Sequence, residues 1–60
     1  MDVETVRKYA GKKVYLVLRN NFEYTTILPN EIDNSFTIID KFGDSVDIEC
    51  EYISFIREIK

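Results

Sequence analysis

The residues of this 60-residue chain that could perform covalent chemistry are one cysteine and the acids beside it. Cys50 lies between Glu49 and Glu51, and neighbouring carboxylates raise the pKa of a thiol and weaken it as a nucleophile. The chain has no histidine and no glycine-rich phosphate loop. We therefore predict no catalytic residue and no enzyme activity, and we interpret Cys50 as a small packed side chain.

Binding of a hard cation is a second possible chemistry. The candidate ligands are Asp44, Asp47, Glu49 and Glu51. Their spacing matches no calcium loop, and one cysteine without histidine cannot form a zinc site. The favoured interpretation is a solvated acidic face, so we predict no metal and no other cofactor. A cation held jointly by several copies of the chain is the alternative.

Recognition of a nucleic acid is the third possibility. Residues 1–19 hold five cations and two acids, whereas residues 20–60 hold three cations and nine acids. A polyanion would therefore be attracted only near the N-terminal segment. The candidate RNA contacts there are Arg7, Lys8, Lys12 and Lys13, and the nearest aromatic side chains for base stacking are Tyr9, Tyr24, Phe36 and Tyr52. Ordinary solvated charges and packed aromatic residues explain the same pattern.

Alternation of apolar and polar residues predicts five strands that position these side chains. The expected ranges are residues 13–19, 22–29, 35–42, 45–50 and 53–58. In the last strand the alternation places Ile53 and Phe55 on one face and Ile56 on the other. Asn20-Asn21 predicts a two-residue hairpin turn with positive φ at both positions.

Turn-forming and strand-breaking residues mark the other boundaries of the predicted strands. Pro29 predicts a bend after the second strand, and residues 30–35 predict an exposed loop. Gly43 and Asp44 predict another turn. These signals leave little of the chain for linkers.

A short helix is expected over residues 2–10. Asp2 is a suitable N-cap, and Gly11 stands where a left-handed residue ends a helix. Val3, Val6 and Tyr9 recur at helical spacing, and so short a helix needs tertiary support. These three residues are therefore expected to lie on the sheet.

Length and element order together predict the fold class. Residues 1–60 form one mostly β domain, in which the short helix precedes a five-stranded, strongly bent antiparallel barrel. SH3-like, OB-type and Sm-like barrels all have suitable strands, and the order of helix, strands and final corner favours the Sm-like form. A domain of this size is marginally stable, so self-association is expected. No signal-like or membrane-length apolar run occurs, so we expect a cytoplasmic protein without a membrane partner.

Two stretches resemble the conserved motifs of the Sm-like family. Residues 11–28, followed by Ile32-Asp33, resemble the first motif, and residues 46–56 resemble the second. The resemblance implies a homo-oligomeric ring in which the fourth strand of one copy pairs with the fifth strand of the next. The implied interface residues are Val46, Ile48, Ile53, Phe55 and Ile56.

The same resemblance implies binding of single-stranded RNA. The loop after the second strand would contribute Asp33, Asn34, Ser35 and Phe36. Glu49 and Cys50 stand where the family has Arg and Gly, and a carboxylate there repels phosphate. The leading prediction is a ring that binds RNA, or acts as an RNA chaperone, with a divergent pocket. The alternative is a structural or adaptor ring that binds protein partners and has lost the pocket.

Overall fold

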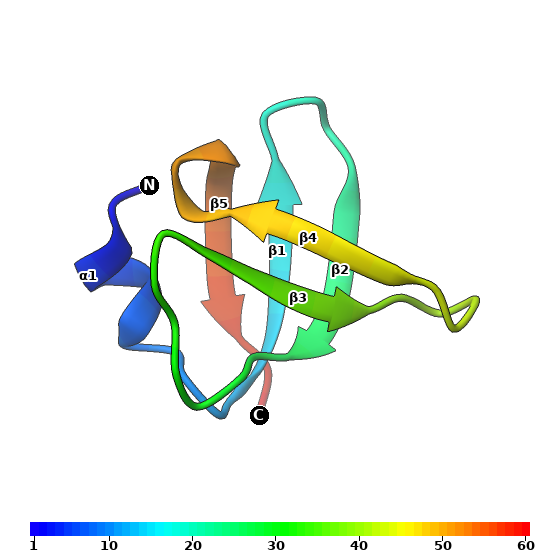
Figure 1. Cartoon of the computed structure of the whole chain (residues 1–60), viewed down its shortest axis with the longest axis horizontal. Coiled ribbons are helices and arrows are strands. Elements are labelled where there is room, and N and C mark those ends of the chain that lie inside the picture. The colour runs from blue at the N-terminus through cyan, green and yellow to red at the C-terminus, as the bar shows by residue number, and fades with distance from the viewer.

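The computed structural model describes all 60 residues and is mostly β, as predicted (Figure 1). One helix precedes five strands, and the last two strands are joined by a short 3-10 helix. These elements are α1 (Val3–Arg7), β1 (Lys13–Leu18), β2 (Glu23–Ile27), β3 (Ser35–Ile39), β4 (Ser45–Glu49), η1 (Cys50–Tyr52) and β5 (Ile53–Glu58). β5 has the predicted bounds, and the other strands are one to three residues shorter than predicted. No helix has the length and apolar character needed to cross a bilayer.

The strands form two antiparallel sheets. β1 is the central strand of the first sheet, whose order is β2-β1-β5, and β3 pairs with β4 in the second. The β3–β4 hairpin crosses in front of the three-stranded sheet and extends beyond β2 (Figure 1). No ladder joins β2 to β3, so the structure consists of two packed sheets and the closed barrel is not confirmed.

The hydrophobic core lies between the two sheets and α1. β1 alternates as predicted, with Val14, Leu16 and Leu18 buried against the other elements. All twelve buried residues belong to one cluster. They are Val6, Val14, Leu16, Leu18, Leu28, Ile32, Phe36, Ile38, Ile48, Cys50, Ile53 and Ile56.

Helix α1 begins at its predicted cap. The Asp2 carboxylate accepts a hydrogen bond of 2.8 Å from the backbone N–H of Thr5. Hydrogen bonding to the Thr5 side chain, and then to its backbone, lowers the pKa of Asp2. Val6 is fully buried, and Val3 and Tyr9 pack against the core as expected. The helix ends earlier than predicted because the amides of residues 9 and 10 bond to carbonyls three residues back, which tightens the last turn.

Gly11 connects the end of this segment to the end of β2. Its φ of 73° is in the left-handed region, as the sequence predicted. The Gly11 N–H lies 3.1 Å from the Leu28 carbonyl oxygen and 3.2 Å from that of Pro29. A β carbon at this position would lie 2.6 Å from Oδ1 of Asn30. The left-handed φ therefore favours glycine at this position, whereas the exposed Asn30 side chain can move aside.

The turn between β1 and β2 differs from the prediction. The Leu18 N–H bonds to the Phe22 carbonyl at 2.8 Å, which leaves a loop of three residues, not two. Only Asn21 has a positive φ, of 69°, because this loop is a turn followed by one left-handed residue. The Asn20 side chain accepts a hydrogen bond from the Phe22 N–H and supports the loop.

The β3–β4 hairpin is built on the same plan. The Asp40 N–H bonds to the Asp44 carbonyl at 2.9 Å, and Gly43 takes the left-handed position with φ 84°. The Asp40 carboxylate accepts hydrogen bonds from the N–H groups of Phe42 and Asp44. Both hairpins therefore have a side chain that bonds to the backbone of its own loop.

The predicted faces of β5 are wrong. Ile53 and Ile56 are both buried, whereas the Phe55 side chain is exposed. The β1–β5 register shifts between Val17 and Leu18, where a bulge lets Leu18 pair with Ile53. The bulge displaces the alternation by one position, so two isoleucines three residues apart reach the same core.

Candidate nucleic-acid interface

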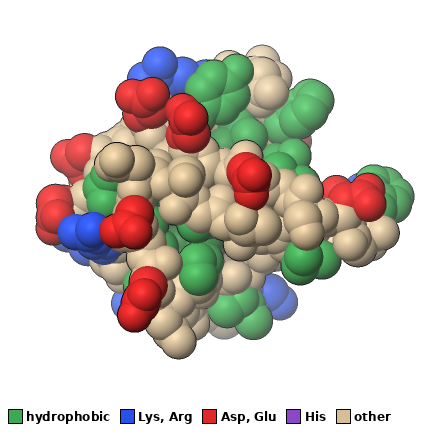
Figure 2. Space-filling view, viewed as in Figure 1, with side chains coloured by type: hydrophobic (Ala, Val, Ile, Leu, Met, Phe, Trp, Pro, Cys, Tyr) green, Lys and Arg blue, Asp and Glu red, His purple; other side chains and the backbone are tan.

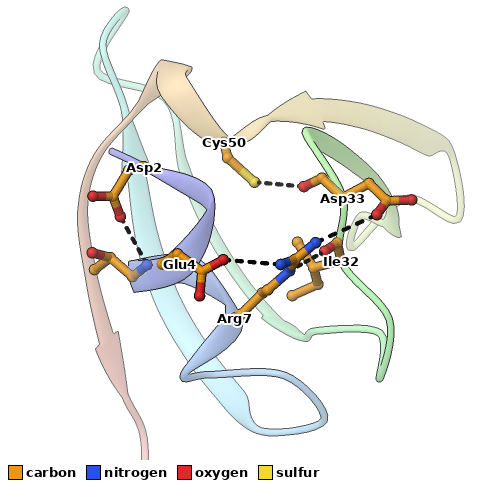
Figure 3. Close-up of polar contacts among 7 residues, drawn as sticks. Asp2, Glu4, Arg7, Ile32, Asp33 and Cys50 are labelled. Carbon is orange, nitrogen blue, oxygen red and sulfur yellow. Dashed lines mark hydrogen bonds and ion pairs between the residues drawn. The ribbon is translucent and has the colours of Figure 1, made fainter.

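The structure brings together the two segments that the sequence assigned to an RNA pocket. The Cys50 N–H donates to the Asn34 carbonyl at 2.8 Å, and the Cys50 thiol lies 3.3 Å from the Asp33 carbonyl oxygen (Figure 3). Ser35 is paired with Glu49 in the β3–β4 ladder. Phe36 is buried in the core and therefore cannot stack on a base.

A cavity of about 520 Å³ lies over this junction, and its charge opposes phosphate binding. Asp2, Glu49 and Glu51 line it together with the polar residues Asn34 and Ser35. No lysine or arginine is in the lining. The Met1 ammonium also lines the cavity, so three carboxylates stand against one cation. The net negative charge repels a polyanion, so the cavity at the predicted pocket is acidic.

Cys50 lies at the base of this cavity as a buried free thiol. Its pKa is raised, as the sequence predicted, but the main cause is burial and not the neighbouring carboxylates. A protonated, buried thiol is a poor nucleophile. No group of three or more Asp, Glu, Cys or His side chains is placed to hold a metal ion.

Arg7 stabilises the fold through bonds to the loop after β2 (Figure 3). Its Nε donates to the Ile32 carbonyl at 2.7 Å. One terminal nitrogen lies 3.0 Å from Glu4, and the other lies 3.5 Å from Asp33. The guanidinium therefore holds α1 against the segment that ends at Asp33, and each of its three nitrogens makes one contact within the fold.

The other predicted RNA contacts are dispersed. Lys12 lies 3.7 Å from a carboxylate oxygen of Glu58, whereas Lys8 is exposed at the end of α1. Lys13 begins β1. Among the predicted stacking residues, Tyr9 and Tyr24 pack against the core and Tyr52 is partly exposed. The four cations near the N-terminus thus do not form one patch of unpaired positive charge, because Arg7 and Lys12 are already in ion pairs.

An aromatic and basic cluster that the sequence did not predict lies on the outer face of the β2-β1-β5 sheet. The rings of Tyr15 and Phe55 meet edge to face, with centroids 6.2 Å apart. The Arg57 guanidinium carbon lies 5.3 Å from the centre of the Tyr15 ring. The Tyr15 hydroxyl donates to the Glu23 carboxylate, and this bond raises the pKa of Tyr15. Lys13 follows the same face of β1 by alternation.

We call this cluster of Lys13, Tyr15, Glu23, Phe55 and Arg57 the outer-sheet cluster. It has two cations and one acid, whereas the whole chain has a net charge of −3. The opposite side of the molecule, which carries the β3–β4 hairpin, has acidic side chains spread over it (Figure 2). The outer-sheet cluster is therefore a positive region on an acidic protein.

The register of β1 with β5 explains why the sequence did not predict this cluster. Tyr15 pairs with Arg57, and Val17 pairs with Phe55. These partners come from opposite ends of the chain, and the bulge reverses the predicted face of Phe55. Alternation within β1 does place Lys13 and Tyr15 on the solvent side, and that was the only local signal.

The predicted interface residues fall into two groups. Ile48, Ile53 and Ile56 are buried within the subunit, so their side chains are already packed. Val46 is partly buried, and Phe55 is 47% exposed. β4 and β5 are each an outer strand of their sheet, so each has one edge without a strand partner. At the start of β5, the Met1 ammonium donates to the Ile53 carbonyl at 3.1 Å.

Comparison of the chain with protein-family models, with curated proteins and with solved structures finds no match. The resemblance to the Sm-like family therefore stays a prediction from the sequence.

Proposed function

We propose that this chain is a non-enzymatic β domain that binds single-stranded RNA on the outer-sheet cluster. The observation that carries the proposal is the contact of Tyr15 with both Phe55 and Arg57 across two strands. Aromatic rings on a sheet surface stack bases, and adjacent cations contact the phosphates that link them. Here one surface offers both interactions.

The geometry suggests how each residue would act. Phe55 is partly exposed and would offer its ring to a base, while Tyr15 supports that ring from the neighbouring strand. Arg57 and Lys13 would contact the flanking phosphates. Glu23 holds the Tyr15 hydroxyl and so fixes the ring orientation. Each stacked base contributes about 1–3 kcal/mol, so binding by one or two bases is weak to moderate.

The dependence of RNA affinity on salt concentration tests this proposal, because cations that contact phosphates neutralise their charge. Each phosphate contact to a single strand changes the slope of log affinity against log salt by about −0.7, so two cations predict a slope of about −1.4. We would measure fluorescence anisotropy of labelled decauridine and decaadenosine between low and moderate salt. Arg57→Gln should weaken binding and reduce the slope by about 0.7.

Matched variants separate this site from general charge effects. Lys8→Gln makes the same charge change on α1 and should leave binding nearly unchanged. Phe55→Leu should lower affinity about tenfold through lost stacking. Tyr52→Leu removes a ring of similar exposure elsewhere and serves as its control. Equal effects of Arg57→Gln and Lys8→Gln, or no RNA binding by the unmodified chain, would refute the proposal.

Assembly into a closed homo-oligomer is the second part of the proposal. The open edges of β4 and β5 support it, because unpaired strand edges are satisfied by pairing with another chain. Pairing β4 of one copy with β5 of the next repeats around a closed ring. Light scattering at low and moderate salt tests this step, and a mass near 7.1 kDa would contradict it.

The acid-lined cavity favours a second candidate function, that of an adaptor for a basic protein segment. Asp2, Glu49 and Glu51 would attract lysine or arginine side chains. Titration with an oligolysine peptide tests this candidate, and Glu49→Gln should weaken the binding. Peptide binding without RNA binding would favour the adaptor over the RNA-binding domain.

A further inference from the structure

The outer edge of β2 carries unpaired backbone groups. The Phe22 carbonyl and the Leu28 N–H both bond to β1 or to the residue before it, at 2.8 and 3.0 Å. Because ladder bonds in antiparallel strands recur at every second residue, the even positions from 22 to 28 face β1. The N–H and C=O groups of Glu23, Thr25 and Ile27 therefore point away from it, toward an edge that no strand covers.

A groove of about 800 Å³ borders this edge, and six of its eleven lining residues are hydrophobic. It lies between the start of β2 and the end of the β3–β4 hairpin, which overhangs β2 (Figure 1). Phe22 is 60% exposed there, Ile39 is 58% exposed and Phe42 is 78% exposed. Hydrophobic side chains gather around the projecting hairpin in the space-filling view (Figure 2).

We propose that a second copy of this chain covers this edge by pairing its own β2 antiparallel to the first, about a two-fold axis at Thr25. The inference is argued from the edge of β2 and not from RNA binding, although the groove shares Tyr15 and Glu23 with the outer-sheet cluster. It uses a different edge from the β4–β5 ring. A two-fold arrangement requires a self-complementary surface, and this edge satisfies that condition. With Thr25 opposite Thr25, each Glu23 stands opposite Ile27, so no like charges face each other.

The overhanging hairpin favours a second copy of this chain as the partner at the β2 edge. A strand added to the edge of β2 would pass beneath the hairpin, so Ile39 and Phe42 of one copy would lie over the partner residues opposite positions 22–25, which are residues 25–28 in this register. The two-fold axis repeats this contact, and the groove of each copy is filled by its partner. The exposed Ile27 side chains would be covered at the same interface.

The buried area is sufficient for a weak to moderate dimer. Phe22, Ile27, Ile39 and Phe42 would each bury on the order of 100 Å², since each is more than half exposed. Two copies would then bury about 800 Å² of apolar side chain. The paired backbones and flanking polar groups bring the total to roughly 1,200 Å², the lower bound for specific interfaces.

A cysteine at the two-fold axis tests the register. Directly opposed residues in a hydrogen-bonded antiparallel pair have Cα atoms about 5.5 Å apart, which suits a disulfide. Thr25→Cys should therefore give a covalent dimer on mild oxidation, visible on a non-reducing gel. Cys50 is buried, so the unmodified chain should stay uncrosslinked.

Thr37→Cys is the matched control, because residue 37 lies on the open edge of β3 and is also exposed. Rapid crosslinking of Thr25→Cys alone supports the proposal. Equal crosslinking of both variants would mean random collision of exposed thiols and would overturn it. Absence of a dimer with Thr25→Cys at high protein concentration would overturn it as well.

Proline variants distinguish this dimer from the proposed ring. The Thr25 N–H makes no bond within the subunit, so Thr25→Pro blocks the edge of β2 and leaves its ladder intact. Asp47→Pro blocks the edge of β4 in the same way. Light scattering should show that Thr25→Pro halves the mass of the assembly, whereas Asp47→Pro leaves a dimer. An unchanged mass for a folded Thr25→Pro would refute the pairing at β2, and a monomeric Asp47→Pro would refute its independence from the ring.

Discussion

Replacing Arg7 by alanine should destabilise the domain and leave RNA affinity nearly unchanged. The Nε hydrogen bond to the Ile32 carbonyl is partly buried and charge-assisted, and such bonds contribute about 1.5–3 kcal/mol when well shielded. The Arg7 side chain is 46% exposed, so we expect the lower end of that range. The two ion pairs involve exposed acids and add at most about 0.5 kcal/mol.

The expected loss in the free energy of unfolding is therefore about 1–2 kcal/mol. In a domain of this size, each kcal/mol lowers the melting temperature by about 4–8 °C. Urea unfolding followed by circular dichroism measures the loss directly. High salt screens the ion pairs but not the bond to the carbonyl, so most of the effect should persist in 1 M NaCl.

Lys8→Ala is the matched control for this experiment. Lys8 is a neighbouring exposed cation with no ion pair or side-chain hydrogen bond, so its removal should change the stability by less than about 0.5 kcal/mol. Equal stability of Arg7→Ala and Lys8→Ala would refute the structural role of Arg7. A loss of RNA affinity by the folded Arg7→Ala variant would instead support the RNA contact that the sequence predicted for Arg7.

Two further predictions concern the backbone and the thiol. Gly43→Ala should cost about 1 kcal/mol in urea unfolding, because φ is 84° and no atom is close. Gly11→Ala should cost a similar amount, because its φ is also left-handed and the end of the Asn30 side chain can move aside; a much larger cost would mean that Asn30 is held in place. Burial raises the pKa of Cys50, so the folded state retains a proton that the unfolded state loses above about pH 8.5, and stability should fall as the pH rises further. Urea unfolding at several pH values should show a smaller decline for Cys50→Ala, and an identical decline would contradict the assignment.

Local sequence signals predicted the secondary structure and much of the core. Alternation placed Val14, Leu16 and Leu18 inside, and Asp2 and Gly11 marked the ends of the first segment. These features depend on residues that are close in sequence. The strand order, by contrast, depends on pairing between segments that are distant in the sequence. Alternation therefore could not predict that β2 and β3 are not hydrogen-bonded to each other.

The candidate site was harder to predict because it depends on backbone contacts and register. The sequence assigned Arg7 to RNA, but its main partner is the carbonyl of Ile32, which has no sequence signature. Phe55 was assigned to a buried or interface position until the bulge opposite Val17 turned it outward. A one-residue change in register exchanges the two faces of a strand, so these positions could not be predicted locally.

The position of β1 between β2 and β5 has a consequence for how the chain folds. The β1–β2 hairpin closes through a short loop and forms in microseconds, whereas the β1–β5 ladder joins segments from opposite ends of the chain. β5 therefore docks late, and substitutions in it should speed unfolding more than they slow folding. Until β5 docks, β1 is also an exposed edge, so this last step is when the chain is most vulnerable to aggregation.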